Sequence, residues 1–319
     1  MKLQTKIPLE KQSEDQIDYS SNVVLFGSCF SENMGKKLDY FKFKNIQNPF
    51  GILFHPKAIE TLISNALENK QYSEEDLFFH NEQWHCFDAH SKLSNSSKDS
   101  LLVELNNQIN LTDSNLKTAS HIVITFGTAW VYRHLKTNKI VANCHKIPQK
   151  EFNKELLTVE EITDSLKNIL QLIQKINSDV TIIFTVSPVR HLKDGFVENT
   201  KSKAHLFSAT HAVINKSPSG VGGFYFPSYE IMMDELRDYR FYNEDMVHPS
   251  QMAVNYIWER FKTVWISDDA FHILDEIDTI QKGLQHKPFN SQSQAHQQFL
   301  QKLKVKVEKL NAQYPHIVF

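Results

Sequence analysis

Short apolar runs alternate with segments of helical period along most of this chain. The clearest helical period, at 158–176, spaces its apolar residues three or four positions apart and leads directly to the β-branched run DVTIIFTVSP at 179–188. The run NVVLF at 22–26 also leads into a helical period, and HIVITF at 121–126 is a further short apolar run. Because parallel strands need crossover connections, usually helical, this alternation predicts an α/β protein with a mainly parallel sheet.

Each of the three apolar runs ends at a small or turn-forming residue. Gly27, Gly127 and Pro188 mark these ends, and a short strand near 43–47 followed by a second helix is predicted between the first two runs. In open α/β sheets the ligand crevice lies at the carboxyl ends of the strands. Functional residues are therefore expected there.

The charge of the chain gives no reason to expect nucleic acid or a membrane as its main partner. The formal net charge is −2, and the Lys and Arg residues are scattered along the sequence. Cys29, Cys86 and Cys144 are too few for a disulfide framework and favour a reducing compartment. The chain start has no apolar signal core, and no stretch approaches the ~18 continuous apolar residues of a membrane span. A soluble cytoplasmic protein is predicted.

The turn after the first strand holds a candidate nucleophile, Ser28. It follows Gly27 and precedes a helical period, so we expect an exposed side chain close to the N–H groups of a helix N-terminus. A serine hydroxyl needs a base in contact and donors for the oxyanion that forms. The neighbouring Cys29 is intrinsically more nucleophilic, but at such a turn we expect it to point into the helix–sheet packing. Taken alone, a Gly-Ser pair is more typical of a plain turn.

The matching base is predicted far along the chain, in RFYNEDMVHPSQMAVNYIWERF at 240–261. His248 precedes Pro249, a residue favoured at the first helical position, so the histidine is expected in the loop that opens a helix. Asp245, three residues earlier, is close enough to accept the imidazole N–H and to fix the tautomer whose other nitrogen takes a serine proton. Without the serine, a capping aspartate beside a surface histidine is the plainer interpretation.

The chain order Ser28, Asp245, His248 resembles that of the SGNH/GDSL hydrolase superfamily. The nearer resemblance is to the GSCFA family, whose N-terminal motif appears here as GSCFSE at 27–32. Six further strings resemble that family in the same order: NPFGILFHP, FGTAWVY, ANCHKIP, TVSPVRHLKDGF, FPSYEIMMDELRDYRFY and DMVHPSQMAVNYIW. The resemblance spans roughly residues 20–265. It implies that Ser28 is the nucleophile, His248 the general base and Asp245 its orienting partner.

The resemblance also implies an oxyanion hole with three donors. One is the backbone N–H of Ser28 or Cys29, and the second is the backbone N–H of Gly51. The third, an Asn side chain in the superfamily, is replaced here by Ala129. The candidates for this third donor are Thr128, Asn143 and His145.

Metal-capable side chains cluster in the polar stretch before the strand at 121–126. They are His80, His85, Cys86, Asp88 and His90. On a strand, Cys86, Asp88 and His90 would share one face and form a partial ligand set. No established zinc-binding spacing is present, so no metal is predicted. The stretch is instead interpreted as lining the substrate cleft, with His90 or Ser91 meeting a polar substrate.

The predicted architecture is a three-layer α/β/α sandwich with a mainly parallel sheet, of the SGNH hydrolase type. It occupies residues 1–266, with an insertion at about 71–118 over the active face. Residues 267–319 form a C-terminal helical extension with a charged amphipathic helix at about 293–312.

The predicted function is a serine-dependent ester hydrolase without a cofactor. It would remove a short O-acyl group, such as acetyl, from a carbohydrate or small metabolite. Arg190, with His191 and Lys203, follows the strand at 179–188 and is expected to bind a carboxylate or sugar hydroxyls. Two alternatives stay open: an acyltransferase that uses the same acyl-enzyme, and a non-catalytic binding protein, which Ala129 favours. The oligomeric state is not predicted.

Overall fold

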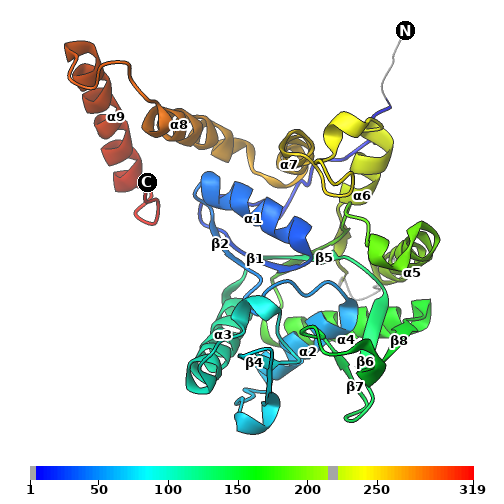
Figure 1. Cartoon of the computed structure of the whole chain (residues 1–319). Helices are drawn as coiled ribbons and strands as arrows, with labels where there is room; N and C mark the ends of the chain where they lie inside the picture. The colour runs from blue at the N-terminus through cyan, green and yellow to red at the C-terminus, as the bar shows by residue number, and fades with distance from the viewer. Residues whose placement is uncertain (1–4, 215–221) are drawn as a thin grey trace.

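A sheet of five parallel strands forms the centre of the protein. The computed structural model describes residues 5–214 and 222–319, and the strand order of its main sheet is β10–β9–β5–β1–β2. These strands are β1 (Asn22–Gly27), β2 (Lys44–Gln47), β5 (His121–Phe126), β9 (Thr181–Val186) and β10 (Phe224–Tyr225). Each neighbouring pair is parallel, so the carboxyl ends lie along one edge (Figure 1). The predicted parallel sheet is confirmed.

Helices cover both faces of this sheet, as Figure 1 shows. One face carries α2 (Pro56–Leu67), α3 (Lys98–Thr118), α4 (Val159–Ile176) and α5 (Phe196–Ile214), and the other carries α1 (Cys29–Tyr40) and α7 (Gln251–Trp265). Side chains alternate along β1: Val24 and Phe26 belong to the core of the first face, and Val23 and Leu25 to that of the second. Because both faces are buried, the strands have continuous apolar sequences. The three-layer prediction is confirmed.

Polar caps fix where the long helices begin. Thr158 and Glu161 form a capping box at the start of α4, one residue inside the predicted boundary. Pro249 does not stand at the first position of the last large helix of the α/β region, where the sequence predicted it. Ser250 is the N-cap of α7 and accepts the N–H of Ala253 at 3.4 Å, so the helix begins at Gln251.

Two smaller antiparallel sheets accompany the main one. β3 (Leu77–His80) and β4 (Gln83–Cys86) form a hairpin, and β6 (Trp130–His134) pairs with β7 (Lys139–Val141) and β8 (Phe152–Leu156). The segment expected as an insertion, 71–118, contains this hairpin and also α3. Leu105 and Ile109 of α3 are buried in the core of the α2–α5 face, so this helix is part of the layer rather than a cover over the active face.

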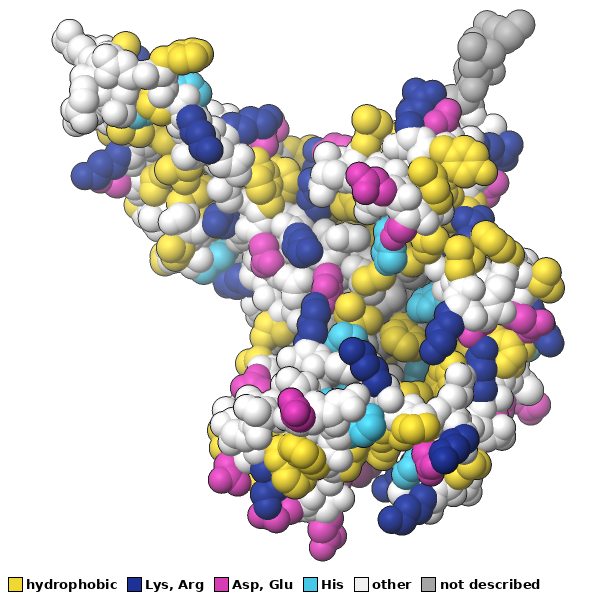
Figure 2. Space-filling model, viewed as in Figure 1, with side chains coloured by type: hydrophobic (Ala, Val, Ile, Leu, Met, Phe, Trp, Pro, Cys, Tyr) yellow, Lys and Arg dark blue, Asp and Glu magenta, His cyan; other side chains and the backbone are white. Residues whose placement is uncertain are grey.

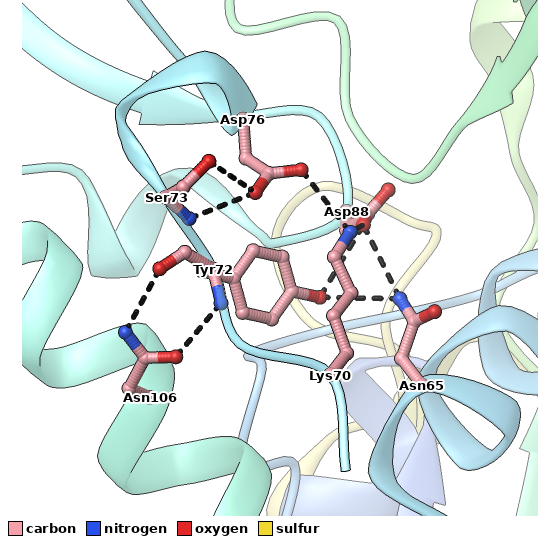
Figure 3. A network of polar contacts seen from close by, with 7 residues as sticks. All are labelled: Asn65, Lys70, Tyr72, Ser73, Asp76, Asp88 and Asn106. Carbon is pink, nitrogen blue, oxygen red and sulfur yellow. Dashed lines mark hydrogen bonds and ion pairs between the residues drawn. The ribbon is translucent and has the colours of Figure 1, made fainter. Parts of the chain in front are cut away.

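A polar network fastens the segment between α2 and α3 to both helices (Figure 3). The Tyr72 N–H donates to Asn106 Oδ1 at 2.8 Å, and Asn106 Nδ2 donates to the Tyr72 carbonyl at 3.1 Å. Asp88 Oδ2 accepts from Lys70 Nζ at 3.1 Å and from the Tyr72 hydroxyl at 3.3 Å. Asn65 of α2 also donates to that hydroxyl, at 3.3 Å. The network positions the chain that leads to His90.

The predicted C-terminal helical extension is confirmed. A one-turn helix, α6 (Ser228–Glu230), follows β10, and after α7 come α8 (Asp268–Gln285) and α9 (Gln294–Gln313). In Figure 1 these last two helices extend away from the sheet. Leu303 and Leu310 of α9 are nevertheless buried, in the core on the α1 side. Within residues 5–214 and 222–319 no helix is long and apolar enough to cross a membrane.

Candidate active site

β1 ends in a tight turn that places Ser28 at the N-terminus of α1. Gly27 has a φ of +132°, and Ser28 is the helix N-cap, with its Oγ accepting the N–H of Phe30 at 3.3 Å. The Ser28 N–H donates to the carbonyl of Thr125 on β5 at 3.0 Å. The expectation of an exposed side chain is wrong: Ser28 is only 1% exposed, because its hydroxyl turns back onto the first turn of α1.

Asn48 holds this turn in place, and sequence reasoning missed it. Its Oδ1 accepts the N–H of Gly27 at 2.8 Å, and its own N–H donates to the carbonyl of Leu25 at 2.9 Å. Its carbonyl accepts the N–H of Gly51 at 2.7 Å. One residue therefore joins the end of β1 to the turn that contains Gly51. Asparagine at the start of NPFG was the available signal, because Asn favours such turns.

Asp245 and His248 form a tight pair in the loop before α7. Asp245 Oδ2 lies 2.6 Å from His248 Nδ1, and Asp245 Oδ1 accepts the N–H groups of Val247 and His248, each at 2.9 Å. The backbone N–H of His248, helped by that of Val247, lowers the pKa of Asp245 to about 2, so its carboxylate stays charged at neutral pH. The contact predicted from the Asp-x-x-His spacing is therefore present. It directs the other ring nitrogen, Nε2, away from Asp245.

No hydrogen bond joins Ser28 Oγ to His248 Nε2 in the described part of the chain. Catalytic hydrogen bonds of this kind are often long until substrate binds. Burial, followed by the positive charge of Lys203, lowers the pKa of His191 to about 4, so this histidine is neutral near pH 7. The positive charge of Lys203 also opposes the rise in the pKa of Cys29, next to Ser28.

The predicted oxyanion donors are for the most part already engaged. The N–H groups of Ser28 and Gly51 donate to backbone carbonyls, as described above, and the Thr128 hydroxyl lies 2.9 Å from that of Ser202 on α5. The backbone N–H of His145 donates to Asn143 Oδ1 at 2.8 Å, a contact that engages His145 but not the side-chain N–H groups of Asn143. These oxyanion roles stay predictions, and most of them require existing hydrogen bonds to be shared or exchanged.

The predicted substrate-binding residues contact different parts of the structure. A Cβ on Gly51 would lie 2.5 Å from the Cβ of His90, so His90 packs directly against the proposed oxyanion turn. Ser91 Oγ lies 3.0 Å from Nδ1 of His145. Arg190 donates to the Tyr242 hydroxyl at 3.4 Å, in the segment before α7.

Cys29 is a weaker nucleophile here than its thiol suggests. Burial, followed by the negative charge of Glu32, raises the pKa of Cys29 above its ordinary value. The thiol is therefore protonated near neutral pH, and the reactive species is the thiolate. Between the two neighbouring side chains, the site favours Ser28.

The partial metal set proposed from strand alternation is not formed. β4 ends at Cys86, so Asp88 and His90 do not continue its alternation. Asp88 is paired with Lys70, and burial raises the pKa of Cys86 to about 12. Among residues 5–214 and 222–319, no group of three or more His, Cys, Asp or Glu side chains is arranged to hold a metal ion.

Lys203 of α5 is a buried cation next to this site. It is 1% exposed, its Nζ donates to the carbonyl of Ser187 at 2.7 Å, and no carboxylate pairs with it within the described chain. Burial lowers the pKa of Lys203 from 10.5 to about 7. A buried ammonium without a counter-ion destabilises a fold.

Lys203→Met is expected to change how stability depends on pH. Because the folded-state pKa is lowered, the folding penalty is fully present below about pH 7 and disappears as pH rises toward 10.5. The free energy of unfolding of the wild type, relative to Lys203→Met, should therefore rise by about 3 kcal/mol between pH 7 and pH 9.5. Urea unfolding at both pH values measures this difference. The exposed neighbour Lys201→Met is the control, and an equal difference at the two pH values would contradict the assignment.

Comparison with known families gives the extent of the conserved unit. The model of the GSCFA family matches residues 22–261, which include Ser28, Asp245 and His248. The model described as GSCFA domain protein, C-terminal domain, matches residues 277–319, within the helical extension. No curated protein matches the chain.

Proposed function

The chain belongs to the GSCFA family, and we propose that it is a serine-dependent ester hydrolase of the SGNH/GDSL type. Its substrate would be an O-acyl ester of a carbohydrate or other small polar metabolite. The observation that carries this proposal is the 2.6 Å contact between Asp245 and His248, which fixes the orientation of the imidazole and leaves its Nε2 available to take a proton.

In the proposed reaction His248 Nε2 takes the proton of Ser28 as its Oγ forms a bond to the acyl carbon. The tetrahedral intermediate collapses when the ester C–O bond breaks and the proton on His248 passes to the leaving alcohol. Water then attacks the acyl-serine, giving its proton to His248, and the acid departs as Ser28 regains a proton. Asp245 stays ionised and stabilises the imidazolium throughout.

Oxyanion stabilisation would come mainly from the N-terminus of α1. Cys29 is the first residue of this helix, so its N–H has no acceptor within the helix. The helix dipole adds a positive potential at the same place. Lys203 contributes further positive charge near Cys29. This arrangement offers a substitute for the side-chain donor that Ala129 lacks.

The solvent exposure of the proposed base, His248, favours hydrolysis over transfer of the acyl group to a second alcohol. The side chains of His248 and Asp245 are 45% and 50% exposed, so water reaches the position from which the acyl-enzyme is attacked. An acyltransferase gains from excluding water at this step.

Labelling with a fluorophosphonate probe tests the proposal. We expect one covalent adduct on the wild-type protein, located on Ser28 by mass spectrometry, and no adduct on Ser28→Ala. Cys29→Ala is the matched control, because it changes the adjacent residue and should keep the label. Labelling that persists in Ser28→Ala, or no labelling of the wild type, would overturn the assignment of Ser28.

A further inference from the structure

A cavity of about 460 Å³ lies at the carboxyl-end side of the main sheet, where Thr128, directly after β5 and Gly127, is one of its lining residues. It is bounded by Phe54 and His55, by the β6–β7–β8 sheet and by residues 191–194 after β9. Its volume falls in the range of pockets that bind small molecules, roughly 300–1,000 Å³. In Figure 2 hydrophobic side chains line a hollow near the middle of the visible face, with lysine or arginine and histidine side chains around it.

The walls of this cavity are mainly apolar. Aromatic and aliphatic side chains from several elements line it, among them Phe54, Trp130, Tyr132, Val141, Ile147 and Phe152. Three polar residues also line the cavity: Lys146, Gln149 and Lys193. All three are exposed, so these polar groups lie at the mouth of the cavity. An apolar group thus gains most by entering, because its transfer from water is favourable.

The histidines in the wall add little polarity. Burial lowers the pKa of His55 and that of His145 to about 4, so both are neutral at pH 7. His55 Nε2 lies 3.1 Å from the Val141 carbonyl and its Nδ1 accepts the N–H of Ala58 at 3.1 Å. His145 Nε2 lies 2.8 Å from the Cys86 carbonyl. The ring nitrogens of these two histidines are already bonded, so at this part of the wall the polar groups of a hydroxyl-rich ligand would find few partners.

The cavity adjoins the carboxyl ends of β1 and β5. His191 lines the cavity, and its Nε2 lies 2.9 Å from the place of a Cβ on Gly127, directly after β5. Phe54, another lining residue, accepts the N–H of Gly127 at 2.7 Å. The preceding residue, Leu53, donates its N–H to the carbonyl of Gly27 at 3.2 Å. The cavity is therefore next to the turn that carries Ser28.

We propose that this cavity binds the acyl chain of the ester, and that the chain is apolar and longer than acetyl. This inference rests on the proposed function, since it places the acyl half of that ester in the cavity and leaves the alcohol half outside it. A polar alcohol would lose hydrogen bonds in the cavity, whereas an acyl chain has none to lose. At roughly 30 Å³ for each methylene-sized unit, the share of a water molecule in the liquid, an eight-carbon chain takes roughly 240 Å³ and fits.

A series of p-nitrophenyl esters from acetate to octanoate tests the acyl pocket. For the wild type we expect kcat/KM to rise at least about tenfold from acetate to octanoate, because each methylene gains apolar contact. Cys144→Trp places a large side chain in the cavity wall and should abolish this rise. The matched control is Leu135→Trp, on an exposed residue of the turn after β6 that does not line the cavity. A flat or falling series in the wild type would overturn the acyl pocket and leave the hydrolase assignment standing.

A binding measurement separates failure of the pocket from failure of the reaction. Titration of the Ser28→Ala protein with octanamide and with acetamide needs no catalysis. We expect octanamide to bind at least about tenfold more tightly, and Cys144→Trp to remove the difference. Preference for octanamide in a protein that hydrolyses no ester would keep the pocket and refute the reaction. Equal affinity for the two amides would refute the pocket. Because this comparison uses the Ser28→Ala protein alone, it remains decisive even if Cys144→Trp fails to fold.

Discussion

His248→Gln is expected to lower kcat for ester hydrolysis by at least about 10,000-fold, the loss seen when only the aspartate of a serine triad is removed; loss of the histidine itself costs up to about a million-fold. Glutamine fills similar space and can still contact Asp245, but it cannot take the proton of Ser28 near neutral pH. The carboxylate of Asp245 also accepts two backbone N–H groups, so the loop should keep its conformation without the imidazole. Initial rates with a p-nitrophenyl ester measure the loss.

The control for this exchange is another exposed histidine. His286, at the end of α8, is changed to glutamine in the same way and should leave kcat within about twofold, because surface positions away from a site rarely affect function. Circular dichroism checks that both variants are folded. If His248→Gln kept a tenth or more of the wild-type kcat, the general base would lie elsewhere and the proposed mechanism would be wrong.

The main elements of the fold follow from local patterns, which is why the sequence predicts them. β5 and β9 are buried on both faces, so each is a continuous apolar run. The 3.6-residue period of α4 places Ile162, Leu166 and Ile169 on one buried face. Such a pattern lies within a short stretch of sequence, so the element can be predicted without knowing which distant residues it contacts.

The β6–β7–β8 sheet depends in part on distant pairing. Tyr132 lies opposite Val141 in a local hairpin, but Trp130 lies opposite Leu156, well beyond that hairpin along the chain. These strands are short and carry charged residues, such as Arg133, which pairs with Glu155 at 2.9 Å. Neither a long apolar run nor a clear alternation marks them. The cavity that this sheet helps to form was therefore absent from the sequence prediction.

The candidate site divides in the same way. The Asp245–His248 contact is local, and a spacing of three residues was enough to predict it. The occupation of the Ser28 N–H depends on the carbonyl of Thr125, nearly a hundred residues away. The sequence therefore identifies candidate catalytic side chains more readily than the backbone groups that surround them.

Gly27→Ala is expected to destabilise the protein by more than about 3 kcal/mol, because the added Cβ causes both backbone strain and a steric clash. A φ of +132° is strained for any residue with a Cβ. The added Cβ would also lie 2.1 Å from the carbonyl oxygen of Thr125, which belongs to the backbone of the neighbouring strand and cannot rotate away. β1 and β5 would have to separate at the turn that carries Ser28.

Gly195→Ala isolates the contribution of the backbone angle. Gly195 also has a positive φ, +92°, but nothing lies within 4 Å of its Cβ position. Its substitution should therefore show the φ strain alone, about 1 kcal/mol. Urea unfolding of the two variants gives the clash at Gly27 by difference. If the two losses were equal, the turn would have room for a side chain. The close approach of β1 and β5 would then not be what requires glycine before Ser28.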